Sequence, residues 1–272
     1  MKNLITRTIS GLLFLVIMVS AILYRYATFW AISCIIVAVG IYEFLNITIP
    51  KTNDLQKGIS VLIGVTLVTL VACITPVVPP VLMYVLFAAV VCLFALILII
   101  ELYQKSEKPF ENIALLILPV IYIAIPFTLM NIMYLGENTK GLSILAFFIF
   151  IWASDVGAYC FGMLLGKHKL FPRISPQKSW EGFFGGILTA IIASILVSKF
   201  MFDGKNLQHW IVISIITAVF GTLGDLVESM LKRSVGVKDS GKIMPGHGGI
   251  LDRFDAALLA FPIVFVYTII AF

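Results

Sequence analysis

The sequence predicts an all-α polytopic integral membrane protein, a bundle of about nine transmembrane helices with a cytoplasmic N-terminus. Of its 272 residues, 61% are hydrophobic and only 12% are charged, and the mean hydropathy is +1.08. Soluble domains are about 45–50% apolar and about 25% charged, so the composition excludes a water-soluble enzyme. One membrane-spanning helix needs about 20 apolar residues, so nine use about 180 and leave room only for short loops.

Apolar runs bounded by charged residues, proline or glycine define the expected helices. The first run follows Lys2 and contains Arg7, which resembles a cleaved signal peptide. Because eight further runs follow it, a retained helix is the better interpretation. The nine expected spans are 5–24, 27–45, 59–75, 81–102, 113–135, 142–165, 183–202, 210–231 and 250–272.

The distribution of basic residues predicts the orientation. With a cytoplasmic N-terminus, 15 of the 19 basic residues lie on the cytoplasmic side, and the other side keeps Arg25, Lys140, Lys199 and Lys205. The positive-inside rule therefore places the C-terminus outside. The formal net charge of +5 has this topological explanation, so no nucleic-acid partner is expected. We expect a multi-pass protein of the cell (plasma) membrane.

The two halves of the chain differ in where they carry charge. In residues 1–140 charges keep to loops and helix ends, apart from Glu43 inside the second span. From residue 150 onward carboxylates lie in or against spans, where ionisable groups are costly and usually functional. These are Asp155, Glu181, Asp225, Glu228, Asp252 and Asp255. We therefore expect an N-terminal transmembrane scaffold region in residues 1–140 and a C-terminal catalytic transmembrane region in residues 141–272.

A polar face is expected near the end of the eighth span. Asp225, Glu228, Ser229 and Lys232 are spaced i, i+3, i+4 and i+7, which places them on one face of a helix. A salt-bridge ladder of the two carboxylates with Lys232 is the structural alternative, and it is compatible with ligand binding.

A glycine-rich loop, residues 238–249, leads into the last span. Such a loop brings backbone N–H groups close to an anion at a helix N-terminus. Asp252 and Asp255 follow at i, i+3, and paired carboxylates beside a phosphate site are typical of Mg²⁺ binding. The spacing leaves open whether His247 contacts phosphate or base, donates a proton or shapes the loop.

A third cluster, residues 152–182, combines a basic run with a polar segment before the seventh span. Lys167, Lys169 and Arg173 fit a positive-inside anchor and substrate guidance equally well. Lys178 and Ser179 favour ligand contact.

One segment resembles the signature of the phosphatidate cytidylyltransferases (CDP-diacylglycerol synthases). The matching residues are Ser229-x-Leu231-Lys232-Arg233-x4-Lys238-Asp239-x-Gly241-x2-Met244-Pro245-x-His247-Gly248-Gly249-Ile250-x-Asp252-Arg253-Phe254-Asp255. Residues 175–182 resemble a second shared segment of that family. The chain departs from the family at Met244, where Leu, Ile or Phe is usual, and at Gln177, where lysine is common. The second departure leaves Lys178 to make a phosphate contact there.

The resemblance implies a reaction of CTP with phosphatidic acid that gives CDP-diacylglycerol and pyrophosphate, Mg²⁺-dependent and in a membrane-embedded homodimer. It also implies a second cation, such as K⁺. We assign Asp225, Asp252 and Asp255 to the metal, and expect these three with Lys232, Arg233 and Arg253 to be catalytic, the basic residues by binding phosphates. The expected substrate-binding residues are Lys178, Ser179, Ser229, Lys238, Asp239, His247, Gly248 and Gly249.

Three other functions share some of these sequence features. A cation transporter also buries carboxylates, but it does not need a glycine-rich loop with basic residues at one membrane face. A CTP-dependent polyprenol or phytol kinase shares CTP and metal but transfers the γ-phosphoryl group, so CDP is its product. A CDP-alcohol phosphotransferase requires an Asp-Gly-x2-Ala-Arg motif, which this sequence lacks.

Overall fold

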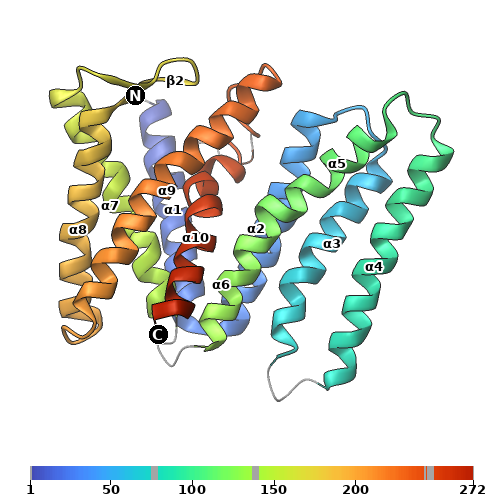
Figure 1. The fold of residues 1–272 in the computed structure, drawn as a ribbon, viewed down its shortest axis with the longest axis horizontal. Coiled ribbons are helices and arrows are strands. Elements are labelled where there is room, and N and C mark those ends of the chain that lie inside the picture. Colours follow the sequence, from blue (N-terminus) through green and yellow to red (C-terminus); the bar gives the residue numbers. More distant parts are fainter. Residues whose placement is uncertain (1, 75–78, 137–140, 242, 244–247, 272) are drawn as a thin grey trace. The chain divides into compact units, whose positions relative to one another are not determined.

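The computed structural model describes residues 2–74, 79–136, 141–241, 243 and 248–271, and the side chains from residue 8 onward. Its elements (Figure 1) are α1 Lys2–Tyr24, α2 Tyr26–Thr48, α3 Asp54–Ala72, α4 Pro80–Tyr103, α5 Pro109–Pro119, η1 Val120–Ala124, α6 Ile125–Gly136, α7 Leu142–Leu165, β1 Lys169–Phe171, β2 Ser175–Ser179, α8 Trp180–Met201, α9 Leu207–Ser234 and α10 Leu251–Ala271.

The predicted membrane fold is confirmed. Each of the nine expected spans falls on a helix or on the continuous run from α5 to α6. Among the described residues, eight helical segments are long and apolar enough to cross a membrane, and α1 adds a shorter apolar stretch, Thr8–Tyr24. The protein is therefore a multi-pass membrane protein, while its orientation stays a prediction.

Helix starts follow local sequence signals. The Asn53 side chain accepts a hydrogen bond of 2.9 Å from the Leu55 amide and caps α3. The Ser179 hydroxyl accepts one of 3.2 Å from the Gly182 amide and caps α8. Pro80 and Pro109 are the first residues of α4 and α5, where a missing N–H costs nothing.

The fifth expected span is not a single α-helix. It is interrupted by η1, a π-helical turn that follows Pro119, and Pro126 follows in α6. Proline has no N–H to donate and its ring clashes with the preceding turn, so the i→i+4 bonding pattern cannot run through this stretch unchanged.

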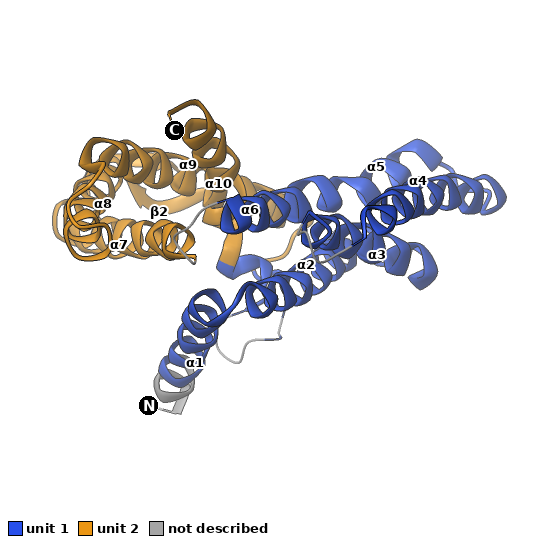
Figure 2. Cartoon of the chain, turned by 90° about the horizontal axis from the view of Figure 1, so that it is seen from below, with its two compact units in different colours: residues 1–138, 239–253 blue, residues 139–238, 254–272 orange. Residues whose placement is uncertain are grey.

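The chain forms two compact units (Figure 2). Unit 1 comprises residues 1–138 and 239–253, and unit 2 comprises residues 139–238 and 254–272. The glycine-rich loop, expected in the C-terminal region, thus belongs to the unit of the first six helices from residue 239 on. Whether residues 1–140 and 141–272 divide into scaffold and catalysis stays a prediction.

Unit 1 buries a polar network as well as an apolar core. Phe29, Phe44 and Phe127 are fully or almost fully buried. Glu101 on α4 is also buried, and it accepts hydrogen bonds of 2.9 Å from both the Gln56 and Asn112 side-chain amides. These donors satisfy a carboxylate that would otherwise be costly to bury.

Unit 2 is held together by close helix contacts at glycines. On α8, Gly182 and Gly186 lie against the backbone of α7, and the Thr189 hydroxyl donates a bond of 2.9 Å to the Ala153 carbonyl. On α9, Gly224 lies against α10, where a Cβ would be 3.2 Å from the Ala256 Cα. Small residues allow such approach between membrane helices.

Candidate active site

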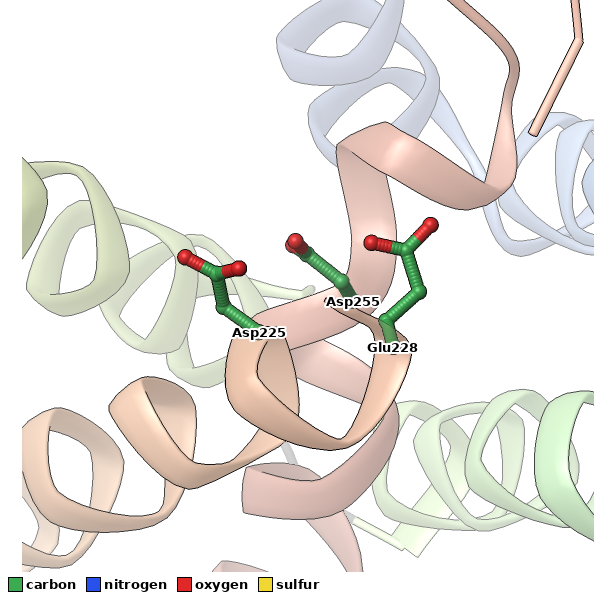
Figure 3. Close-up of side chains that lie close together, drawn as sticks. All are labelled: Asp225, Glu228 and Asp255. Carbon is green, nitrogen blue, oxygen red and sulfur yellow. The ribbon is translucent and has the colours of Figure 1, made fainter. Parts of the chain in front are cut away.

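Three carboxylates of unit 2 converge where α9 meets α10 (Figure 3). Asp225 and Glu228 come from α9 and Asp255 comes from α10, and one oxygen of each lies within 4.8 Å of the others. The i, i+3 spacing places the first two on one helix face. The close approach at Gly224 brings the third beside them.

Two lysines neutralise part of this negative charge. The Lys178 Nζ lies 2.6 Å from Asp225 Oδ2, and the Lys232 Nζ lies 2.7 Å from Glu228 Oε2. The Glu228 side chain is fully buried and that of Lys232 is 13% exposed, so this pair is shielded from water. The salt-bridge ladder considered from the sequence therefore exists for Glu228 and Lys232, whereas Asp225 pairs with a lysine from the hairpin strand β2.

Hydrogen bonds orient two of the carboxylates. The Ser229 hydroxyl donates to Asp225 Oδ1 at 3.2 Å, and the Ala256 amide donates to Asp255 Oδ1 at 2.7 Å. Three carboxylates converge here, and two lysine ammonium groups pair with two of them. Oxygen ligands with surplus negative charge are what Mg²⁺ requires, so this donor set fits a divalent cation.

A cavity of about 480 Å³ is lined by one of these three carboxylates, Asp225. Lys178, Asp225 and Asp155 provide charged groups in its wall, and Met163 and Phe183 provide apolar surface. A pocket with mostly apolar walls and a few convergent polar groups is typical of a small-molecule site. The full lining is Asp155, Ala158, Tyr159, Gly162, Met163, Leu170, Gln177, Lys178, Ser179, Gly182, Phe183, Thr222 and Asp225.

Glu181, at the start of α8, is committed to a local structural role. Its carboxylate accepts a bond of 2.7 Å from His168 Nδ1 and bonds of 3.2 Å from the Lys167 and His168 amides. It thereby ties the first turn of α8 to the chain that enters the β1–β2 hairpin.

A second cluster, within unit 1, is built around Asp252. Its Oδ2 accepts bonds of 3.0 Å from the Ser240 amide, 3.0 Å from the Ser240 hydroxyl and 2.8 Å from the Gly249 amide. Gly248 has φ +83°, a conformation that glycine adopts without steric cost. The Asp252 carboxylate thus links Ser240 to Gly249 ahead of α10.

The expected site residues fall into two groups. Unit 2 brings together Lys178, Asp225, Ser229, Lys232 and Asp255, whereas Asp239, Gly248, Gly249, Asp252 and Arg253 belong to unit 1. The assignment of Asp252 to the metal stays a prediction. The Asp252 Oδ2 atom accepts hydrogen bonds from Ser240 and Gly249.

The remaining expected residues are placed less specifically. Arg233, Lys238 and Arg253 are exposed, and Ser179 is buried as the N-cap of α8. His247 lies outside the described residues.

Sequence reasoning missed two residues of these clusters. The sequence predicts Glu228 on the polar face of α9 but not among the metal ligands, and its i+3 spacing from Asp225 is the signal that points to this role. Glu43 was noticed only as a carboxylate inside an apolar span. Its contact with the loop joins residues 208 positions apart, and no local pattern indicates such a pairing.

Comparison with known proteins gives the same family as the signature. The model of the Cytidylyltransferase family matches residues 5–271. A phosphatidate cytidylyltransferase of Staphylococcus epidermidis is 45% identical over 163 residues, which are 59% of this chain and 61% of that protein. One of Staphylococcus saprophyticus gives the same figures. One of Staphylococcus aureus is 32% identical over 259 residues, 95% of this chain and 96% of that protein. The resemblance found in the sequence is thereby confirmed.

Proposed function

The chain belongs to the cytidylyltransferase family, and from this premise we propose that it is a phosphatidate cytidylyltransferase. It joins CTP to phosphatidic acid and releases CDP-diacylglycerol and pyrophosphate, for phospholipid biosynthesis. The observation that carries the proposal is the group of Asp225, Glu228 and Asp255 beside a cavity whose wall includes Lys178.

The chemistry matches this set of groups. An unesterified phosphate oxygen of phosphatidic acid forms a bond to the α-phosphorus of CTP, the bond from that phosphorus to the bridging oxygen breaks, and pyrophosphate leaves with the electron pair. The second pKa of a phosphate monoester is about 6, so the nucleophile is already ionised at pH 7 and no general base is needed. The site has to hold two polyanions together and stabilise the charge of the leaving group.

Lysines and carboxylates divide this work. Lys178 and Lys232 present ammonium groups beside the carboxylates, where they can bind phosphate oxygens. Their positive charge also offsets the repulsion between the phosphates of the two substrates. Asp225, Glu228 and Asp255 would hold Mg²⁺, which when bound neutralises charge on the leaving pyrophosphate. From the sequence we retain Asp252 as a further candidate ligand, with K⁺ as the candidate second cation.

The setting of the reaction is part of the proposal. CTP is a cytosolic substrate, and the basic residues are concentrated on the side of the N-terminus, so the active site faces the cytoplasm of the plasma membrane. The family resemblance supports a homodimer. Phosphatidic acid reaches the site from the surrounding membrane lipids.

The test is an assay of purified, detergent-solubilised protein with radiolabelled CTP, phosphatidic acid and Mg²⁺. We expect equal amounts of labelled CDP-lipid and pyrophosphate, lost with EDTA and strongly reduced in Asp225→Asn. Lys199→Ala, an exposed lysine in the last turn of α8, is the control that keeps activity. Absence of label from the lipid, with CDP formed from a polyprenol acceptor, would identify a lipid kinase instead. Cation flux without nucleotide would identify a transporter.

A further inference from the structure

Glu43 is a buried carboxylate that belongs to neither the carboxylate group nor the cavity described above. It lies on α2, inside an apolar span, and is 5% exposed. A carboxylate is buried at high cost unless hydrogen bonds satisfy it. Its Oε2 accepts bonds of 3.0 Å from the Leu251 amide and 3.3 Å from the Ser240 hydroxyl. Both donors belong to residues 239–253 of unit 1, which comprise the loop before α10 and the first turn of α10 and are called the signature loop below.

The loop is shaped around this carboxylate. A Cβ on Gly241 would collide with Glu43 Oε1, and a Cβ on Gly249 would collide with Glu43 Oε2 and with the Ser240 hydroxyl. Glycine at both positions lets the backbone approach the Glu43 carboxylate closely without displacing it. Two glycines of the signature are thus in contact with a residue about 200 positions earlier in the chain.

Glu43 also accepts a hydrogen bond from the first turn of α10. Leu251 is the first residue of α10, and the first amides of a helix have no partner within the helix and carry partial positive charge. Glu43 therefore acts as an N-terminal cap that α2 supplies to α10. The same helix carries Asp255 four residues further along the chain.

Ser240 connects Glu43 to a predicted site residue. The Ser240 hydroxyl lies 3.3 Å from Glu43 Oε2 and 3.0 Å from Asp252 Oδ2, so its single hydrogen is shared between two carboxylates. Asp252 Oδ2 also accepts from the Ser240 and Gly249 amides. Loss of Glu43 would free Ser240 and the first turn of α10, and would thereby change the orientation of Asp252.

We propose that Glu43 is a positioning residue for the cytidylyltransferase reaction, acting through Ser240 and Asp252 to hold the described parts of the signature loop, residues 239–241 and 248–253, in place for substrate binding. This rests on the proposed function. It gives the N-terminal half of the chain a part in catalysis that its apolar composition does not indicate.

The test compares Glu43→Ala and Glu43→Gln with Glu101→Gln in the full-length, solubilised protein. Glu101 is a matched control because it is a similarly buried glutamate of unit 1, and its hydrogen bonds go to Gln56 and Asn112. Two properties are measured: kcat and KM for CTP, and hydrogen exchange of the segment that contains residues 239–253.

Glu43→Ala should raise the KM for CTP and lower kcat/KM by about 10- to 100-fold, the range expected for lost hydrogen bonds to a charged group. Exchange in the 239–253 segment should increase. Glu43→Gln keeps a carbonyl oxygen that can accept from the Leu251 amide, so it should recover most of the loss, to within about 5-fold of the wild type. Glu101→Gln should lower thermal stability without changing KM or exchange in the loop.

An unchanged KM in Glu43→Ala, together with wild-type exchange in the loop, would overturn the proposal even if kcat fell, because a purely structural role lowers the active fraction alone. Failure of the proposed function looks different. In that case the wild type makes no CDP-lipid, and exchange in the three variants still decides whether Glu43 holds the loop.

Discussion

The contact between α9 and α10 at Gly224 can be tested with a single methyl group. A Cβ at this position would collide with the Asp255 carbonyl oxygen and would lie 3.2 Å from both the Ala256 Cα and the Leu259 Cβ. Carbon atoms in favourable contact are about 3.5–4.0 Å apart, so Gly224→Ala must separate the two helices by roughly 0.5–1 Å. That movement takes Asp255 away from Asp225.

The activity should respond more strongly than the stability. Overpacking costs about 1–3 kcal/mol, whereas replacing glycine by alanine within a helix returns about 1 kcal/mol, so the net loss of stability in Gly224→Ala is about 0–2 kcal/mol. A displacement of about 1 Å in an active site can reduce the rate by about 100-fold. We therefore expect kcat/KM to fall about 100-fold with a small decrease in Tm.

Gly221→Ala is the matched control, on the same helix and nearly one turn earlier. Its Cβ would lie 3.5 Å from the Ala256 Cβ, an ordinary contact, so wild-type activity and unchanged or slightly higher stability are expected. Initial rates of CDP-lipid formation and thermal unfolding in detergent measure both variants. Wild-type kcat/KM in Gly224→Ala would refute the reasoning. Equal losses in the two variants would show that the helix contact lacks the expected specificity.

Three further predictions concern individual side chains. Lys178→Ala removes the ion pair of 2.6 Å with Asp225 and should lower kcat/KM by about 100-fold in the lipid-labelling assay. A loss of this size is typical when an electrostatic contact to the transition state is removed. Lys199→Ala should leave kcat/KM unchanged. Glu228→Gln should raise the Mg²⁺ concentration for half-maximal rate by about 10-fold or more, and a shift only in Asp252→Asn would transfer the ligand role to that residue. Ser179→Ala removes the α8 cap and should cost about 1 kcal/mol in thermal unfolding.

The helices could be predicted from the sequence because each long apolar run has to satisfy its backbone groups within the membrane. The irregular parts could not. The π-helical turn at Val120–Ala124 depends on how two prolines are accommodated in one span. The hairpin of Lys169–Phe171 with Ser175–Ser179 has a polar, proline-containing strand that shows no period-2 apolar pattern.

The geometry of the candidate site was predictable from residue spacing only where its residues share one helix. The spacing of Asp225 and Glu228 fixes their common face because the helix repeat is local. The approach of Asp255 depends on the absence of a side chain at Gly224. The contact of Glu43 with the loop depends on tertiary packing between residues far apart in sequence, which hydropathy and spacing do not encode.

The buried carboxylates differ in the kind of partner they have rather than in how deeply they are buried. Glu101, Glu43 and Glu228 are all at least 95% buried. Glu101 and Glu43 accept hydrogen bonds from amides and a hydroxyl of unit 1, so the positions of these partners are set by the fold. Glu228 instead faces the ammonium group of Lys232. Lysine carries its charge on a flexible stem and also binds phosphate. Lys232 can therefore exchange Glu228 for a substrate phosphate when polyanionic substrates bind. A reaction between two polyanions needs such exchangeable charge, and within the described residues it is concentrated where α9 meets α10.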